Sequence, residues 1–286
     1  MSASASTAVQ PERLSAERRL PWSLQGVARV LALPLVVGAG LVAWEVLVVV
    51  TGTNEVILPR PTSIFRALVD GFSAPITSRA SYVPHLRQTL GEVLAGYALG
   101  CSAGLALATV SVRFPLVEFL TRPLVIAFQS VPKVALAPLV IIWFGLGFNS
   151  KFALVTLATF FPLFVNGIAG FKSVDEGPLR MMRSFGASGW QVFTKVTFPA
   201  ALPYIFAGLE IALVHAITSA IAAEFLGGQM GLGVMILQME QLLETPAIFS
   251  VLVILAVTGW LLSLALGLAR RRIVYWAPVE RHTAER

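Results

Sequence analysis

Charged residues are scarce in this sequence. The chain has 286 residues, of which only 13% are Asp, Glu, Lys or Arg, whereas 56% are hydrophobic. Soluble globular domains carry about 25% charged residues, and a soluble core of this size could not absorb so many apolar side chains. A bilayer can absorb them, because each spanning helix must cross about 30 Å of hydrocarbon. The composition therefore excludes an ordinary soluble domain and indicates a multi-pass membrane protein.

Cysteine and catalytic motifs are also scarce. The single cysteine, Cys101, lies in an apolar run and cannot form an intramolecular disulfide, so we interpret it as a small packing residue. The three histidines lack metal-ligand spacing, and the chain contains no phosphate-binding loop, HExxH or GxSxG motif. We therefore predict that the chain is not an enzyme and has no cofactor or metal. Any ATP hydrolysis that drives it must occur in a separate partner.

Apolar runs of spanning length recur along the chain. They predict an all-α membrane protein with about six transmembrane helices. The tail before the first span is polar and rich in Ser, Ala and Arg, which is typical of a disordered segment. The predicted domains are a disordered tail at 1–26, a transmembrane domain at 27–270 that includes the loop at 174–203, and a C-terminal tail at 271–286. The predicted spans are 27–50, 90–110, 124–148, 152–171, 202–226 and 248–268.

The distribution of basic residues predicts the orientation of the helices. With a cytoplasmic N-terminus, fifteen Lys and Arg residues fall in inside segments and five, including Lys151, in outside segments. Cytoplasmic loops carry the excess of basic residues in membrane proteins, so both termini are predicted to be cytoplasmic. The net charge of +6 is explained by these short loops, and nucleic-acid binding is not expected.

Several polar residues fall inside the predicted spans. An ionisable group in hydrocarbon costs at least a few kcal/mol, so each is a candidate functional residue or a member of a structural pair. Pro123, Pro132 and Pro138 predict that the third span is kinked or broken, and such breaks occur beside protein or a water-filled cavity. We therefore expect this span to border a translocation route. The candidate pathway residues are Lys133, Trp143, Glu210 and Glu224, the last in a wet position near the outer end of its span.

Two stretches outside the spans have helical patterns. Residues 61–72 begin with a proline and place five apolar side chains on one face, which predicts a short amphipathic helix on the outer surface, lying on lipid or packed on the bundle. The loop at 174–203 is long, apolar and basic. In it, Leu179, Met182 and Phe185 share a helical face, Gly186 permits a tight turn, and a second short helix starts at Trp190 and ends before Pro199. Exposed aromatic residues there fit either a docking surface for another protein or a helix pair on lipid headgroups.

This loop resembles the coupling loop of binding-protein-dependent ABC importer permeases. That loop reads Glu-Ala-Ala, three residues, Gly, nine residues and Ile-x-Leu-Pro, and here Gly186, Val196 and Pro199 match its spacing. The Glu-Ala-Ala triplet is replaced by Arg180-Met181-Met182. Further motifs over about residues 55 to 270 resemble the nitrate, sulfonate and taurine branch of the family: Leu58-Pro-Arg-Pro61, Trp143-Phe-Gly145, Ser150-Lys151, Phe160-Phe-Pro162 and Gly231-Leu-Gly233.

The resemblance implies a function and a set of partners. It implies a permease of the type I ABC importer fold in a bacterial inner membrane, paired as a homodimer, with cytoplasmic ATPase subunits below and a solute-binding protein above. The solute would be a nitrate-, sulfonate- or taurine-like anion or a pyrimidine-type precursor, and the loop at 227–247, with Glu240 and Glu244, would face the binding protein. The ATPase-coupling residues implied are Arg180, Met181, Met182, Phe185, Gly186, Ala187, Trp190, Val196 and Pro199.

Three other interpretations stay open on the residues alone. An ion-coupled secondary transporter would use polar groups near the midplane and usually has repeated halves, but no internal repeat is visible. An intramembrane enzyme would need a convergent catalytic set. A passive scaffold would fit the composition. Co-purification with a soluble ATPase would separate the ABC permease from all three.

Overall fold

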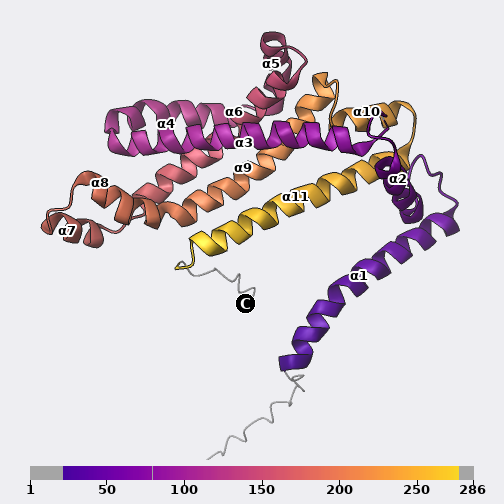
Figure 1. Cartoon of the computed structure of the whole chain (residues 1–286), viewed down its shortest axis with the longest axis horizontal. Coiled ribbons are helices and arrows are strands. Elements are labelled where there is room, and N and C mark those ends of the chain that lie inside the picture. Colours follow the sequence, from indigo (N-terminus) through magenta and orange to yellow (C-terminus); the bar gives the residue numbers. More distant parts are fainter. Residues whose placement is uncertain (1–21, 79, 277–286) are drawn as a thin grey trace, which may run out of the picture. The chain divides into compact units, whose positions relative to one another are not determined.

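The described part of the chain is entirely helical. The computed structural model describes residues 22–78 and 80–276, which divide into two units with a boundary after Gly52. The first unit contains α1 (Trp22–Thr51), which begins within the predicted N-terminal tail, and residues 1–21 of that tail lie outside the described residues. The second unit (Figure 1) contains α2 (Pro61–Ser73), α3 (Tyr82–Arg113), α4 (Pro115–Ser130), η1 (Lys133–Leu136), α5 (Ala137–Phe144), α6 (Phe148–Lys172), α7 (Glu176–Ser184), α8 (Gly189–Val192), η2 (Phe193–Thr197), α9 (Phe198–Gly227), α10 (Leu232–Gln241) and α11 (Thr245–Ile273).

Five helical segments of the described residues are long and apolar enough to span a membrane. They correspond to five of the spans predicted from sequence. α3 and α11 extend beyond the predicted bounds, because their ends carry polar residues that a hydropathy window leaves out. The five segments are Pro34–Thr51, Tyr82–Arg113, Phe148–Lys172, Gly189–Gly227 and Thr245–Ile273.

The third predicted span is not one helix. α4 ends at Ser130, Val131 and Pro132 leave the helical conformation, and the chain continues as the short helices η1 and α5. Proline lacks an N–H group and disfavours the helical conformation in the residue before it, which accounts for the break at Val131. Pro123 stays inside α4, and Pro138 lies in the first turn of α5, where the missing N–H costs nothing. Of the three prolines predicted to kink or break this span, Pro132 is therefore the one at which the helix ends.

The second short helix of the coupling loop does not end before Pro199. α8 passes through the π-turn η2 directly into α9, and the whole segment Gly189–Gly227 is continuous. The N–H of Phe198 reaches back five residues to the carbonyl of Phe193. This wider turn makes room for the ring of Pro199. In a regular α-helix, that ring would clash with the carbonyl group one turn earlier. The coupling loop is therefore joined to α9 without a hinge.

The core of the second unit lies where α3, α6 and α9 pack together. Glycines at every fourth position of α3 face α6, which lets the two backbones approach closely. A Cβ atom at Gly100 would lie 2.1 Å from Thr159 Oγ1 and 2.4 Å from the carbonyl oxygen of Thr156. At Gly104 it would lie 2.4 Å from the carbonyl oxygen of Phe160. The contact of α3 with α6 therefore depends on these glycines.

The predicted amphipathic helix is α2. It starts at Pro61 as predicted, buries Ile64, and packs against α11 and α3. The ring of Tyr82 lies edge-on to Phe72 at 5.5 Å between centroids, and its hydroxyl shares a 2.6 Å hydrogen bond with Ser250 of α11. α2 is thus packed on the bundle, although Phe65 on the same helix stays 67% exposed.

Candidate functional site: two ends of the helix bundle

The predicted coupling loop, at 174–203, forms two helices joined by a tight turn. Gly186 has a φ of +73°, a left-handed conformation that glycine adopts without strain. The Gly186 N–H donates to the carbonyl of Arg183 (3.0 Å), and the Ala187 N–H donates to that of Met182 (3.1 Å), which closes the end of α7. Ser188 and Gln191 then form a reciprocal capping box at the start of α8. The predicted turn at Gly186 is confirmed, and local sequence accounts for its geometry.

This helix–turn–helix exposes large apolar side chains at one end of the bundle, marked by α7 and α8 in Figure 1. Phe185 is 81% exposed, Trp190 73% and Met181 56%. Arg180 forms an ion pair with Glu176 one turn earlier on α7, and both side chains are exposed. Such a surface pair contributes little to stability, so Arg180 remains available to a partner. Most of the surface of Phe185 and of Trp190 is therefore left uncovered by the described chain.

The base of this surface is anchored to the spanning helices. The ring of Trp190 stacks on that of Phe193, with 5.9 Å between the ring centroids. The ring of Phe193 in turn lies against that of Phe171 at the end of α6, with 5.6 Å between centroids. Val196 lies in the π-turn, and Pro199 lies in the first turn of α9. A force applied to Trp190 therefore acts directly on α9 and on the end of α6.

A buried polar cluster lies at the opposite end of the bundle. Lys151, in the first turn of α6, is only 2% exposed. Its Nζ donates to the carbonyl oxygens of Leu146 (2.5 Å), Gly147 (3.0 Å) and Gly227 (3.2 Å). Gly227 is the last residue of α9, so this one ammonium group ties the start of α6 to the end of α9.

Two buried carboxyl groups accompany Lys151. Glu92 and Glu224 are 0% and 1% exposed, and they interact with each other and with the Lys151 ammonium. Glu224 accepts hydrogen bonds from the Thr89 hydroxyl (2.7 Å) and the Gly233 N–H (2.6 Å). These bonds connect α9 to α3 and to the start of α10. The cluster fixes the turn between α9 and α10 by polar contacts that water does not reach.

The cluster also explains the glycines of this turn. A Cβ atom at Gly231 would lie 2.2 Å from the Glu224 carboxyl, and Gly231 has a φ of +136°. His85 contacts the same residue through Nδ1, at 3.1 Å from its N–H and 2.9 Å from its carbonyl oxygen. Only glycine fits this position, which gives a structural reason for the Gly231-Leu-Gly233 motif.

Two expectations about these residues are wrong. Glu224 is not wet, because its side chain is enclosed by α3 and by the turn before α10. Lys151 is not in an external loop but is buried in α6. Charge counting cannot find such a residue, because its partners are carbonyls of Leu146, Gly147 and Gly227, and carbonyls carry no sequence signal. The only hint in the sequence is the Ser150-Lys151 motif.

The other candidate pathway residues lie apart from this cluster and from one another. Glu210 of α9 pairs with Arg270 of α11 at 3.0 Å, so it is a structural pair. Trp143 of α5 is 66% exposed. Lys133, at the start of η1, borders a small cavity between η1, α6 and α9, and its Nζ lies 5.9 Å from the ring centroid of Phe161. Lys133 thus lines a polar cavity.

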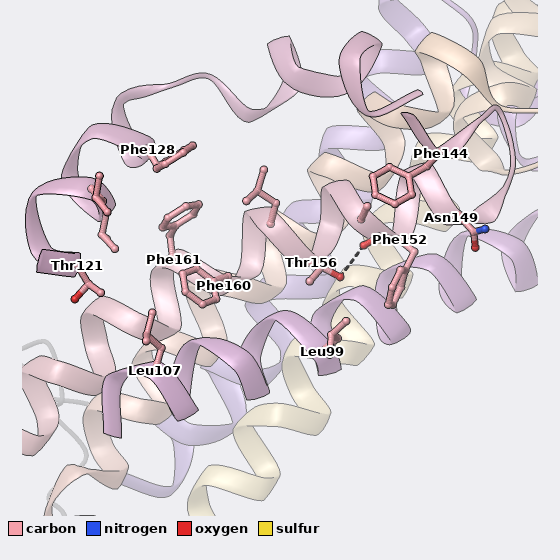
Figure 2. A pocket seen from close by; sticks show the side chains of 14 residues that line it. Leu99, Leu107, Thr121, Phe128, Phe144, Asn149, Phe152, Thr156, Phe160 and Phe161 are labelled. Carbon is pink, nitrogen blue, oxygen red and sulfur yellow. Dashed lines mark hydrogen bonds between the residues drawn. The ribbon is translucent and has the colours of Figure 1, made fainter. Parts of the chain in front are cut away.

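A large apolar groove, with a volume of about 770 Å³, lies between α3, α4, α5 and α6 (Figure 2). Phe128, Phe160 and Phe161 point into it. The Thr156 hydroxyl is already used, since it donates to the Phe152 carbonyl at 2.7 Å. A charged solute would find no charged partner on these walls, so the groove suits apolar side chains or lipid chains. No group of three or more His, Cys, Asp or Glu side chains within 22–78 and 80–276 could hold a metal ion.

Comparisons with known proteins give a consistent result. The family model of binding-protein-dependent transport system inner membrane components matches residues 96–275. The chain is 34% identical to the riboflavin transport system permease protein of Chloroflexus aurantiacus, over 94% of this chain and 96% of that one. It is 30% identical to the taurine transport system permease protein of Escherichia coli, over 82% of this chain and 86% of that one. It is 32% identical to the formylaminopyrimidine transport permease protein of Halalkalibacterium halodurans, over 77% and 85%.

A solved structure has the same fold. An inward-facing structure of the MetNI methionine ABC transporter contains a chain that matches with a TM-score of 0.59 and 20% identity, over 67% of this chain and 95% of that one. The family match covers more than half of the sequence and includes the loop at 174–203, the cavity at Lys133, and Lys151 and Glu224 of the buried polar cluster. The chain therefore belongs to the family of binding-protein-dependent transport system inner membrane components, and it is the membrane-spanning permease subunit of an ATP-driven ABC importer.

Proposed function

We propose that two copies of this chain form the solute pathway of the importer in a bacterial inner membrane, with both termini cytoplasmic. The observation that carries the proposal is the apolar surface of α7 and α8, where Phe185 and Trp190 are 81% and 73% exposed. Exposed aromatic residues are rare on stable monomers and are enriched at the centres of protein interfaces. An ABC ATPase subunit, which hydrolyses the ATP, binds this surface.

The charge distribution supports this orientation. α3, α6 and α11 end with Arg113, with Lys172 and with Arg270 to Arg272. All three helices run toward the end of the bundle from which α9 starts, where α7 and α8 lie (Figure 1). Basic residues are concentrated on the cytoplasmic side of membrane proteins. The coupling surface accordingly faces the cytoplasm, and α10, which bears Glu240, faces the solute-binding protein.

The Arg180-Met181-Met182 triplet makes the proposed contact with the ATPase unusual. Arg180 brings a positive charge to the position where the family has an acidic residue, and Met181 brings a flexible apolar side chain where it has a small one. Methionine adapts to irregular grooves because its side chain is unbranched and polarizable. A groove that accepts this chain should therefore be wider and more acidic than one that accepts Glu-Ala-Ala. Phe185, Gly186 and Trp190 then supply the shape of the contact.

The relatives suggest the solute class. Their names refer to riboflavin, taurine, formylaminopyrimidine and aliphatic sulfonates. We propose a small solute of the sulfonate or taurine type, or a pyrimidine-type precursor, delivered by the binding protein. ATP binding would close the ATPase pair and move the two coupling surfaces together. The solute pathway between the two permease copies would then open to the outside. Transport is then a rigid-body alternation between two states that ATP binding biases.

Co-purification and vesicle uptake test this function together. The tagged full-length chain should co-purify with an ABC ATPase in a complex with two copies of each. Proteoliposomes holding the complex and the binding protein should accumulate solute only with ATP. Uptake driven by an ion gradient in the absence of any ATPase would contradict the proposal. A complex that contains one permease copy beside a different permease would contradict the homodimer alone.

A further inference from the structure

The cavity at Lys133 brings an ammonium group, an imidazole and an amide side chain together beside an aromatic ring. It measures about 240 Å³, below the 300–1,000 Å³ typical of sites for drug-sized ligands, so it suits a small solute. Its walls come from η1, α6 and α9, and its charged group is an ammonium. The lining residues are Lys133, Phe161, Pro162, Val165, Asn166, Ile211 and His215.

The cavity lies at mid-depth in the bundle. α6 has 25 residues and is therefore about 37 Å long, and Phe161 lies near its middle. His215 likewise lies in the middle part of α9, which has 30 residues. Lipid headgroups lie about 15 Å from the midplane of a 30 Å hydrocarbon layer. An ion that reaches Lys133 is therefore a solute in the bundle and not a headgroup phosphate.

Lys133 lacks the counter-charge that Arg270 and Lys151 have. Arg270 pairs with Glu210, and Lys151 lies beside two carboxyl groups. No carboxylate within the described ranges lies at ion-pairing distance from Lys133 Nζ, which contacts the Phe161 ring instead. A cation at this depth is costly unless an anion or water reaches it. The site is therefore electrostatically complementary to an anion.

The neighbouring polar groups are arranged for hydrogen bonding. The Asn166 amide donates to the Pro162 carbonyl at 2.8 Å, which orients the side chain and leaves its carbonyl oxygen available in the cavity. The His215 ring lies on the facing helix and interacts electrostatically with Lys133. An imidazole N–H and an ammonium both donate hydrogen bonds to oxyanions. The Phe161 ring provides an apolar wall for a short carbon chain.

We propose that this cavity is a pathway subsite for a small organic anion, such as a short alkanesulfonate. The ammonium of Lys133 neutralises the anionic group, and His215 donates a hydrogen bond to it. The carbonyl of Asn166 accepts a hydrogen bond from the solute where the solute also carries an amine. This proposal rests on the proposed function, because it concerns a step of the same transport route. It narrows the solute class to anions.

The electrostatic potential in this cavity can be tested by the rates at which charged thiol reagents modify one introduced cysteine. Ile211 lines the cavity and is 46% exposed, and Cys101 is the only native cysteine. The full-length chain with C101S and Ile211→Cys is reconstituted and treated with sulfonatoethyl or trimethylammonioethyl methanethiosulfonate. With Lys133 present, the anionic reagent should react faster relative to the cationic one. Lys133→Gln should lower this rate ratio about tenfold, because one unit charge is removed within several ångströms of the thiol.

Two further variants and a protection experiment complete the design. Lys133→Arg should keep the rate ratio, and Lys172→Gln should also keep it, because Lys172 lies at the far end of α6 and pairs with Glu118. Millimolar ethanesulfonate should slow modification of the Lys133 protein and not of Lys133→Gln, whereas glycerol should have no effect. A misfolded variant would change both reagent rates in one direction, whereas loss of the charge changes them in opposite directions.

Three results would overturn the subsite. They are an unchanged ratio in Lys133→Gln, no modification by either reagent with or without the ATPase and ATP, and no protection by ethanesulfonate. Because the rate measurements need only the reconstituted chain, they can fail while ATP-dependent uptake succeeds. In that case the subsite is wrong and the proposed function stands. If no ATPase co-purifies while the charge effect is present, the proposed function is wrong, and the cavity is an anion site with no part in ATP-driven import.

Discussion

The contacts of Lys151 explain how a single residue carries a charge in a buried position. Its three N–H donors each have a carbonyl acceptor, and two carboxyl groups lie close by. A buried cation is tolerated only when its hydrogen bonds and its counter-charge are both supplied. Since two of the acceptors lie before α6 and the third ends α9, Lys151 connects two spanning helices as well as satisfying its own charge.

Lys151→Met should therefore destabilise the protein strongly. Methionine fills a similar volume but leaves the carbonyls of Leu146, Gly147 and Gly227 and the two carboxyl groups without the ammonium. Removing one partner of a buried charge pair costs about 3–5 kcal/mol. For a chain of this size, the midpoint of thermal unfolding in detergent should fall by about 10 °C.

Lys172→Met is the matched control for this substitution. Its ammonium also pairs with a carboxylate, that of Glu118, but the Lys172 side chain is 51% exposed. Exposed pairs contribute about 0–1 kcal/mol, so the unfolding midpoint should change by no more than about 3 °C. Equal shifts for the two variants would mean that the buried contacts of Lys151 do not stabilise the bundle.

Among the elements, α3 and α6 pack most closely because glycines remove side chains from the contact. Gly100 has two close neighbours on α6, and one of them is a backbone oxygen that cannot rotate away. The helix pair must separate if a methyl group is added there. Interhelical contact in a membrane depends on such close packing, since lipid tails are as apolar as the side chains they compete with.

Gly100→Ala should lower stability for this reason. Inserting a methyl group into a close-packed contact typically costs about 1–3 kcal/mol, which corresponds to a fall of about 5 °C in the unfolding midpoint. Gly91→Ala is the control on the same helix, because its Cβ would meet only Phe148 Cε2 at 3.7 Å, an ordinary contact. Alanine favours a helix interior over glycine, so this variant should be neutral or slightly stabilised. A stabilised Gly100→Ala protein would contradict the close contact.

The spanning helices and the amphipathic helix α2 follow from sequence because each has a local signal. Hydropathy over about 20 residues marks a span, and Pro61 marks the start of α2. The tight turn at Gly186 also follows, since glycine is the residue that adopts its backbone conformation. The path of the chain through Pro199 does not follow, because a π-turn absorbs the clash that proline normally causes. A local pattern predicts where a helix is strained, but not how the strain is relieved.

The buried polar cluster escapes prediction for a different reason. Thr89 and Glu224 are 135 residues apart in sequence, and their hydrogen bond depends on how α3 meets α9. The partners of Lys151 are backbone carbonyls, which every residue has. A sequence can indicate that Glu224 is costly in a membrane, but the compensation comes from tertiary contacts.

On the scale of the whole molecule, α9 links the proposed coupling surface of α7 and α8 to the buried polar cluster. Trp190 stacks on Phe193 at its start, and Glu224 accepts hydrogen bonds near its end. No turn or glycine hinge separates Trp190 from α9, because α8 continues into it through the π-turn. Motion imposed on α8 is therefore carried along a continuous helix past the Lys133 cavity. The proposed contact between Trp190 and the ATPase is the point at which this motion would begin.

Trp190→Ala should accordingly weaken binding of the ATPase and uncouple ATP hydrolysis from transport. Loss of a central aromatic residue from an interface typically costs 2 kcal/mol or more, which corresponds to about a 30-fold weaker affinity. Trp260→Ala is the control, since Trp260 is 62% exposed on α11, away from α7 and α8. ATPase affinity is measured with reconstituted permease, and coupling is measured as stimulation of hydrolysis by the loaded binding protein. Because Trp190 also packs on Phe193, the unfolding midpoint of both variants is recorded. Affinities within twofold of each other for the two variants would remove Trp190 from the coupling surface.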